Sequence, residues 1–283
     1  MASKTSKRVS NGNRSALSKN SKTLGPVDDL GAHIPNEWWK RIFDAYYLKT
    51  DGDVVGDPRI TSDEVTQFSE AMNLERDHKI LDLCCGQGRH SIELGRRGFS
   101  NVYGLDQSHY LIKQARIQAR KENLGIKFLK GDARKLPYPD DFFDRVMIAG
   151  NSFGYFETLE EDLVVLTEVF RILKPWGLLL LDISDGEYLA DHYEPRSWEW
   201  IDKQYFVVRE RKLSLDNRLL SREIITDVNK GIIDDRFYCE RLYTKDSIEN
   251  LLTKAGYTHV QFLSELCPQS QRNQDLGMMA RRY

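Results

Sequence analysis

Residues 80–98 read ILDLCCGQGRHSIELGRRG, and the fold follows from this stretch. The apolar residues of 80–83 predict a short buried strand. Gly86 and Gly88 predict a turn without β-carbons, and the residues after them predict a helix that stops at Gly98. A strand, a glycine turn and a helix N-terminus together form a cradle in which backbone N–H groups face a ligand.

An acid follows at the spacing that a nucleoside site requires. Asp106 ends the next predicted strand, VYGLD (102–106), about 20 residues after the glycines, where an acid meets a ribose hydroxyl. The chain is therefore expected to hold a nucleoside. The alternative is that Asp106 only caps the helix predicted in SHYLIKQA (108–115).

The glycine turn departs from the dinucleotide fingerprint G-x-G-x-x-G/A, because Ser91 stands at its third position. A nicotinamide oxidoreductase stays an alternative, although the C-terminal half carries no second glycine fingerprint. Asp82 lies inside the first strand, where its charge would repel a pyrophosphate. It suits a cationic or zwitterionic ligand, such as an amino acid that carries a sulfonium.

Five segments together resemble the class I S-adenosylmethionine-dependent methyltransferases. They occur in the order and spacing of that family and cover roughly residues 38–283. The most similar group within the family is that of the ubiquinone/menaquinone-methyltransferase-like enzymes, which act on small molecules. The chain departs from the family at Cys84-Cys85, where Gly-Cys or Gly-Ser is more usual. The five segments are ILDLCCGQGRH (80–90), VYGLDQS (102–108), FLKGDARKLPYPDDFFDRV (128–146), ILKPWGLLLLDI (172–183) and YTKDSIENLLTKAGY (243–257).

The resemblance implies an α/β fold, a doubly wound and mostly parallel seven-stranded Rossmann-like sheet. Residues 184–243 break the α/β rhythm with alternating charged, β-branched and aromatic residues, which predicts an inserted antiparallel β segment. We expect it to form a substrate lid or to pair across a homodimer. Residues 1–30 are expected to be a disordered basic tail, and 31–283 the methyltransferase domain.

Two helices are predicted ahead of this domain's first strand. NEWWKRIFDAYY (36–47) carries Trp38 and Trp39 on a helical apolar face, and TSDEVTQFSEAMNL (61–74) follows, capped by its first or second residue. In the family such helices lie over the cofactor and help to close the site. The tryptophans could equally serve only to pack on the sheet.

The resemblance also implies S-adenosyl-L-methionine as the cofactor. Asp106 would accept hydrogen bonds from both ribose hydroxyls, Asp132 would contact the adenine amino group, and Asp82 would organise the amino-acid end. Asp132 could instead be a turn acid before RKLP (134–137). The cofactor-binding residues implied in this way are Asp82, Gly86, Gly88, Asp106, Gln107, Asp132, Ala133 and Asn151.

Two residues are candidates for catalysis. Tyr155 lies in the loop NSFGYF (151–156), which faces the donor methyl in this fold, and an aromatic ring can contact a sulfonium by cation–π attraction. His192, in LADHYEPRSW (189–198), lies where the inserted segment could supply a base. The alternatives are a packing role for Tyr155 and a solvated side chain for His192.

The leading functional hypothesis is methyl transfer to a small-molecule acceptor, whose identity and acceptor atom the sequence does not give. A methyltransferase of RNA or protein is the first alternative, favoured by the basic tail and by RKENLGIKFLK (120–130). The net charge of −2 makes nucleic acid an unlikely partner. A non-catalytic cofactor-binding partner subunit is the second alternative.

The composition also bears on metals and location. The four cysteines have no zinc spacing, and no H-E-x-x-H pattern is present, so no metal site is expected. Reduced thiols are typical of a cytoplasmic protein. No apolar run approaches the roughly 20 residues of a membrane span, so no membrane association is expected.

Overall fold

The computed structural model describes residues 25–263 and 275–283. Most of the predicted basic tail, residues 1–24, and Cys267 lie outside the described residues. The described chain is attached to the fold from its first residues onward. The Gly25 carbonyl accepts a hydrogen bond from Arg222 at 2.7 Å, and the side chain of Leu30 is buried.

A seven-stranded sheet A forms the centre of the molecule, in the order β10-β11-β5-β4-β1-β2-β3. Strands β1 to β5 pair in parallel, and β11 runs antiparallel to both β5 and β10. This arrangement confirms the predicted doubly wound, mostly parallel sheet. The strands are β1 (Ile80–Leu83), β2 (Val102–Asp106), β3 (Lys127–Lys130), β4 (Phe143–Ile148), β5 (Leu173–Ser184), β10 (Thr258–Leu263) and β11 (Asp275–Arg281).

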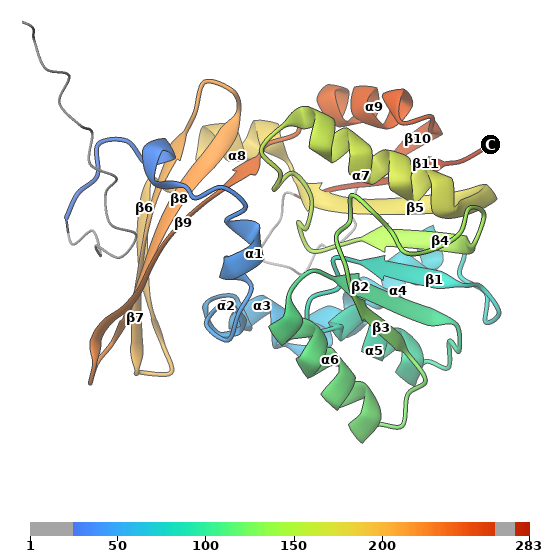
Figure 1. The fold of residues 1–283 in the computed structure, drawn as a ribbon, viewed down its shortest axis with the longest axis horizontal. Coiled ribbons are helices and arrows are strands. Elements are labelled where there is room, and N and C mark those ends of the chain that lie inside the picture. Colours follow the sequence, from blue (N-terminus) through green and yellow to red (C-terminus); the bar gives the residue numbers. More distant parts are fainter. Residues whose placement is uncertain (1–24, 264–274) are drawn as a thin grey trace, which may run out of the picture.

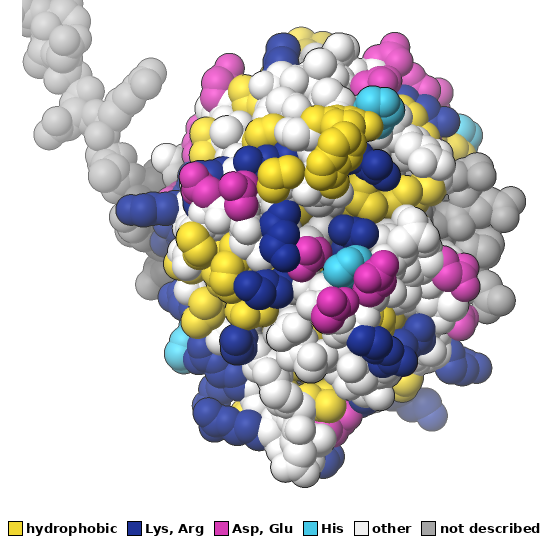
Figure 2. All heavy atoms as spheres, turned by 90° about the vertical axis from the view of Figure 1, so that its right-hand side faces the viewer, with side chains coloured by type: hydrophobic (Ala, Val, Ile, Leu, Met, Phe, Trp, Pro, Cys, Tyr) yellow, Lys and Arg dark blue, Asp and Glu magenta, His cyan; other side chains and the backbone are white. Residues whose placement is uncertain are grey.

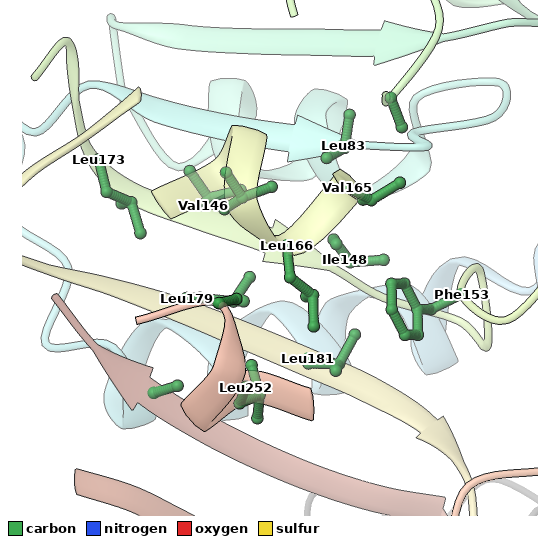
Figure 3. Packing of buried hydrophobic residues seen from close by; sticks show 14 of the residues in the cluster. Leu83, Val146, Ile148, Phe153, Val165, Leu166, Leu173, Leu179, Leu181 and Leu252 are labelled. Atoms are coloured by element: carbon green, nitrogen blue, oxygen red, sulfur yellow. The ribbon is translucent and has the colours of Figure 1, made fainter. Parts of the chain in front are cut away.

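Helices cover both faces of sheet A (Figure 1). Helices α7 (Leu159–Ile172) and α9 (Lys245–Lys254) lie on one face, where Leu166 and Leu252 pack against apolar side chains of β1, β4 and β5 (Figure 3). The other face carries α4 (Pro58–Ala71), α5 (Arg89–Arg96) and α6 (His109–Lys121). The central strands are buried on both faces, which explains their continuous apolar runs.

The inserted segment forms a second, four-stranded antiparallel sheet B, in the order β6-β7-β8-β9. A short helix, α8 (Gly186–His192), leads into it from the carboxyl end of β5. Sheet B stands beside the core domain, with the first short helices between the two (Figure 1). Its strands are β6 (Arg196–Ile201), β7 (Tyr205–Leu213), β8 (Arg218–Asp227) and β9 (Gly231–Arg241).

The N-terminal helices differ from their prediction. Residues 36–47 do not form one helix, because Phe43 leaves the helical conformation (φ −82°, ψ 75°) and the carboxylate of Asp44 accepts from the Tyr46 N–H at 2.8 Å, which starts a new turn. The second helix begins earlier than predicted, since Asp57 caps it ahead of Pro58. The short helices are η1 (Gly31–His33), α1 (Trp39–Ile42), α2 (Tyr47–Thr50) and α3 (Gly52–Val55).

The surface mixes charges of both signs. On the face shown in Figure 2, Lys and Arg side chains lie among Asp and Glu side chains rather than in one basic patch. Within the described part of the chain, every helix is too short or too polar to cross a bilayer.

Candidate functional site

The glycine turn after β1 has the conformation that its sequence demands. Gly86 and Gly88 have positive φ angles of 56° and 77°, and Cys84 adopts φ 60° despite its side chain. A β-carbon on Gly88 would lie 2.6 Å from Cζ of Phe128. Gly88 therefore lets α5 approach β3, while Gly86 and Cys84 face an open space at the strand ends.

Asp106, at the end of β2, connects the turn to the following helix. Its carboxylate accepts hydrogen bonds from the Gly86 N–H at 2.9 Å and from the Ser108 N–H at 2.7 Å. Ser108 itself caps α6, because its hydroxyl accepts from the Leu111 N–H. Burial raises the pKa of Asp106 to about 6, although both hydrogen bonds favour the charged form. The group is thus mainly a carboxylate at neutral pH.

A narrow cavity of about 80 Å³ opens beside Asp106. Six of the predicted site residues line it together, namely Gly86, Asp106, Gln107, Asp132, Ala133 and Tyr155. Asp82 and Gly88 are not among the described residues that line it. The rest of its wall is apolar or aromatic, and consists mainly of Trp39, Phe43, Tyr47, Cys84, Leu105, Leu111, Ile148, Phe153, Phe156 and Val165.

The N-terminal segment closes one side of the narrow cavity. The side-chain amide of Gln107 donates to the Trp39 carbonyl at 2.6 Å, and the Ser108 hydroxyl donates to the Phe43 carbonyl at 2.6 Å. Trp39 and Phe43 are thereby held over the end of β2. Trp38 faces the other way and packs against Tyr155 and residues of sheet B. Trp39 therefore lines the narrow cavity, whereas Trp38 packs against sheet B.

Asp132 lines the narrow cavity and also makes the turn that was its alternative role. Its carboxylate accepts from the Arg134 N–H at 2.9 Å and from the Arg134 guanidinium at 2.6 Å. Burial opposes the charge, but these hydrogen bonds outweigh it and lower the pKa of Asp132. Arg134, which sequence reasoning missed, also covers the rings of Trp39 and Phe156, with its guanidinium carbon 5.2 and 4.6 Å from their centroids.

Asp82 is buried inside β1 and is not among the described residues that line the narrow cavity. It is 1% exposed, and its carboxylate accepts from the Ser91 hydroxyl at 2.7 Å and from the Ser91 N–H at 3.2 Å. Burial raises the pKa of this carboxyl. Asp82 therefore holds the first turn of α5 against β1.

A buried ion cluster supports the same turn from α4. Glu64 accepts from His90 at 2.9 Å and from both terminal nitrogens of Arg89. Burial alone would raise the pKa of Glu64, but the hydrogen bonds and charges of His90 and Arg89 lower it to about 2. The cluster joins α4 to the start of α5, directly after the glycine turn.

A wide cavity of about 740 Å³ lies between sheet B, α8 and the short N-terminal helices. Phe43, Tyr47 and Tyr155 line both cavities, so the two are neighbours across these rings. The described lining includes six carboxylates, three guanidinium groups and eight Trp, Tyr or Phe rings. The charged residues are Asp51, Glu194, Glu199, Glu223, Glu240, Asp275, Arg209, Arg211 and Arg236.

The remaining predicted residues line the wide cavity. Asn151 adopts φ 56° just after β4, and its side-chain amide donates to Glu240 at 2.7 Å and accepts from the Ser184 N–H at 3.0 Å. The Tyr155 hydroxyl donates to the Asn151 carbonyl. His192 lies at the end of α8, where its ring stacks on that of Tyr188 with centroids 3.9 Å apart.

Comparisons with known proteins agree with this architecture. The model of the methyltransferase domain family matches residues 80–177. A Bacillus subtilis protein named "Putative methyltransferase YqeM" is 29% identical over 198 residues, which are 69% of this chain and 79% of that protein. The demethylmenaquinone methyltransferase of Geobacillus kaustophilus is 32% identical over 154 residues, and the match spans 45% of this chain and 63% of that enzyme.

A solved structure shares the fold of almost the whole described chain. It is an S-adenosylmethionine-dependent methyltransferase from Clostridium acetobutylicum, with a TM-score of 0.68 and 19% identity, and the match covers 84% of this chain and 96% of that one. The chain has the fold of the class I S-adenosylmethionine-dependent methyltransferases, and residues 80–177 match their methyltransferase domain family. The methyl donor named for that solved structure is S-adenosylmethionine.

The narrow cavity of this methyltransferase has the chemistry that a nucleoside needs. Asp106 offers a carboxylate at the end of β2, and Leu111, Ala133 and Val165 offer flat apolar contacts. Its volume of about 80 Å³ is small. A cavity of roughly 150 Å³ is known to hold benzene. An adenosyl group is larger than this volume, so rings such as those of Trp39, Phe43 or Phe156 would have to move outward for it to bind.

Proposed function

We propose that this methyltransferase transfers the donor methyl group to a small polar molecule bound in the wide cavity. The observation that carries the proposal is the shared wall of the two cavities, formed by Phe43, Tyr47 and Tyr155. A donor in the narrow cavity and an acceptor in the wide cavity would meet at these rings. The size of the wide cavity, about 740 Å³, lies within the usual range for small-molecule sites.

The donor supplies a methyl carbon already activated by the adjacent sulfonium. What the protein must add is binding, alignment and exclusion of water, and positioning alone is worth several kcal/mol. Asp106 would accept from the ribose hydroxyls, and Asp132, held by Arg134, would face the adenine amino group. Gln107 would flank the adenine and the Ala133 backbone would lie close to it.

Other predicted residues would act through these contacts. Gly86 would let the main chain approach the donor, while Gly88 and Asp82 would keep the glycine turn in place. The Asn151 main chain would lie beside the methionine portion. The ring of Tyr155 would face the sulfonium, and His192, which lines the wide cavity, stays a candidate base.

The test is to incubate the protein with a deuterated-methyl donor and a metabolite extract of its source organism, and to search by mass spectrometry for compounds that gain the label. We expect a labelled small molecule, and a labelled product at least tenfold less abundant with Asp106→Ala. Label found only in RNA or protein would overturn the small-molecule acceptor. Tight donor binding without transfer to any fraction would favour a non-catalytic partner subunit.

A further inference from the structure

The wide cavity has a negative formal charge, which favours a cationic ligand. Among the described residues that line it, six carboxylates face three guanidinium groups, so its formal charge is negative. Arg209 pairs with two of these carboxylates, Glu199 and Glu223, the latter at 2.8 Å. Arg236 pairs at 2.8 Å with Asp234, which is not among the lining residues. A phosphorylated or carboxylated acceptor would meet net repulsion here, whereas a cationic one would be attracted.

The aromatic lining favours the same kind of ligand. The rings come from the N-terminal segment, the loop after β4, the segment from α8 to β6, and β9, and ring faces attract ammonium groups. Combined carboxylate and ring contacts are thus suited to a protonated amine. The eight rings are those of Trp38, Phe43, Tyr47, Tyr155, Tyr188, Tyr193, Trp198 and Tyr238.

One carboxylate of the wide cavity is connected through Asn151 to Tyr155, which lines both cavities. Glu240, near the end of β9, accepts a hydrogen bond from the Asn151 side-chain amide at 2.7 Å. Asn151 is fixed in turn by the Ser184 N–H at 3.0 Å, and its own N–H donates to the Asp182 carbonyl at 3.1 Å. The Tyr155 hydroxyl donates to the Asn151 carbonyl, and the Tyr155 ring lines both cavities.

The structure assigns to the wide cavity an acceptor that carries an amine, and to Glu240 the binding of its ammonium group and the removal of its proton. This assignment rests on the proposed function, because it places the acceptor in the wide cavity. Asn151 is a positioning residue, since it orients the Glu240 carboxylate toward the end of β4. The amine nitrogen is thereby held beside Tyr155, at the boundary where the donor methyl would arrive.

The proposed reaction transfers one proton from the acceptor to Glu240 and one methyl group from the donor to the acceptor nitrogen. The acceptor ammonium gives one proton to a Glu240 oxygen, which frees the nitrogen lone pair. That lone pair forms the new N–C bond to the methyl carbon, while the C–S bond breaks and its electron pair stays on sulfur, leaving a neutral thioether. The product is a methylated ammonium. The proton on Glu240 leaves to solvent through the wide cavity.

The acceptor class is tested with a deuterated-methyl donor and a metabolite extract divided in two. One half is treated with N-hydroxysuccinimidyl acetate, which acetylates amines at neutral pH, and the reagent is then quenched. We expect labelled product from the untreated half and its loss from the treated half, with the label on nitrogen in fragment spectra. A labelled product that survives the treatment, or carries the label on oxygen, sulfur or carbon, overturns the amine assignment. No label in either half overturns the proposed function instead.

The role of Glu240 is tested with Glu240→Gln, which keeps an amide oxygen for Asn151 but carries no charge. With the amine acceptor from the extract, we expect kcat/KM to fall about 100-fold at pH 7, in line with the loss of a positioned base. The Kd for the donor should stay within twofold, which also shows that the variant is folded. Glu249→Gln, on the exposed face of α9, is the matched control and should leave kcat/KM unchanged. An unchanged kcat/KM in Glu240→Gln overturns the assignment.

Discussion

The side-chain amide of Gln107 donates a hydrogen bond to the backbone carbonyl of Trp39 at 2.6 Å, across 68 residues of sequence. It ties the N-terminal segment to the end of β2, directly over the narrow cavity. If the donor binds here as proposed, aromatic rings must move outward to admit it, and this bond would resist both its entry and its release.

Replacing Gln107 with Ala should therefore change rates more than affinity. One such hydrogen bond is worth about 1 kcal/mol, so we expect the association and dissociation rate constants of the donor each to rise about fivefold. The Kd should stay within about twofold. Stopped-flow tryptophan fluorescence measures both rates. Gln118→Ala, on α6 and away from both cavities, is the control. An association rate unchanged by Gln107→Ala would contradict a closed segment that must open.

The titration of Asp106 predicts how donor binding depends on pH. Its pKa in the folded chain is about 6, raised mainly by burial, so the carboxylate that we propose to accept from the ribose becomes protonated below this pH. Donor affinity should be nearly constant from pH 7.5 to 6.5 and fall about tenfold per unit well below pH 6. Titration calorimetry from pH 5 to 7.5 measures this. Asp106→Asn should bind more weakly and with a flat pH profile, and a slope as steep as that of the unmodified protein would assign the titration to another group.

Acidification should weaken donor binding, but through the raised pKa of Asp106 it should increase the stability of the folded protein. A carboxyl whose folded pKa lies above its ordinary 3.8 binds its proton more tightly in the folded state. It therefore contributes stability that is fully present below about pH 4 and is lost as the pH rises through about 6. In Asp106→Asn this part of the stability profile should flatten. Urea unfolding of the donor-free protein at pH 4, 5, 6 and 7 measures the difference.

Gly88 is expected to be intolerant of any side chain. A β-carbon would lie 2.6 Å from the Phe128 ring, and φ 77° is strained for an L-residue, so Gly88→Ala should lower the free energy of unfolding by about 2–4 kcal/mol. Gly125→Ala is the matched control, because nothing lies within 4 Å of its β-carbon. Thermal unfolding of both variants decides the matter. Equal melting temperatures of the two variants would show that α5 can move away from β3 without lowering the free energy of unfolding.

Breaking the ion cluster at the start of α5 should destabilise the protein. Glu64→Gln removes the charge that compensates buried Arg89 and His90, and such losses cost about 3–5 kcal/mol. The pKa of Glu64 is lowered to about 2 from 4.5, so its contribution is present above pH 4.5 and is lost as the pH falls toward 2. The stability gap between the two proteins should therefore narrow on acidification. A gap that stays constant between pH 7 and pH 3 would argue against this linkage.

The parallel core could be predicted because its signals are local. The buried run of β1, the glycine turn and the acid at the end of β2 lie within 27 residues, from Ile80 to Asp106, and each has one favourable structure. The N-terminal segment was harder, since Asp44 stops a helix that the apolar spacing of its neighbours favours. A short polar side chain that captures a backbone N–H outweighs weak helix propensity there.

The sequence could predict which candidate site residues lie together only where those residues stand at the ends of neighbouring strands. Asp106 and Asp132 follow adjacent parallel strands, so topology alone brings them to one cavity. Glu240 and Asn151 are 89 residues apart, and their contact depends on how sheet B docks on the core domain. A single sequence contains no local signal for such docking. Arg134 had a weak signal, a cation two residues after Asp132.

The division of labour between the two sheets has an evolutionary consequence. Sheet A and its loops provide most of the wall of the narrow cavity, the proposed donor site, whereas α8 and sheet B provide most of the wall of the wide cavity, the proposed acceptor site. Mutations in β6 to β9 could thus change which compound is methylated without altering the narrow cavity. Homologous proteins with this fold can change their acceptor specificity by replacing one hairpin of sheet B at a time. The same hairpins could be grafted in an engineered protein to redirect methylation to another compound.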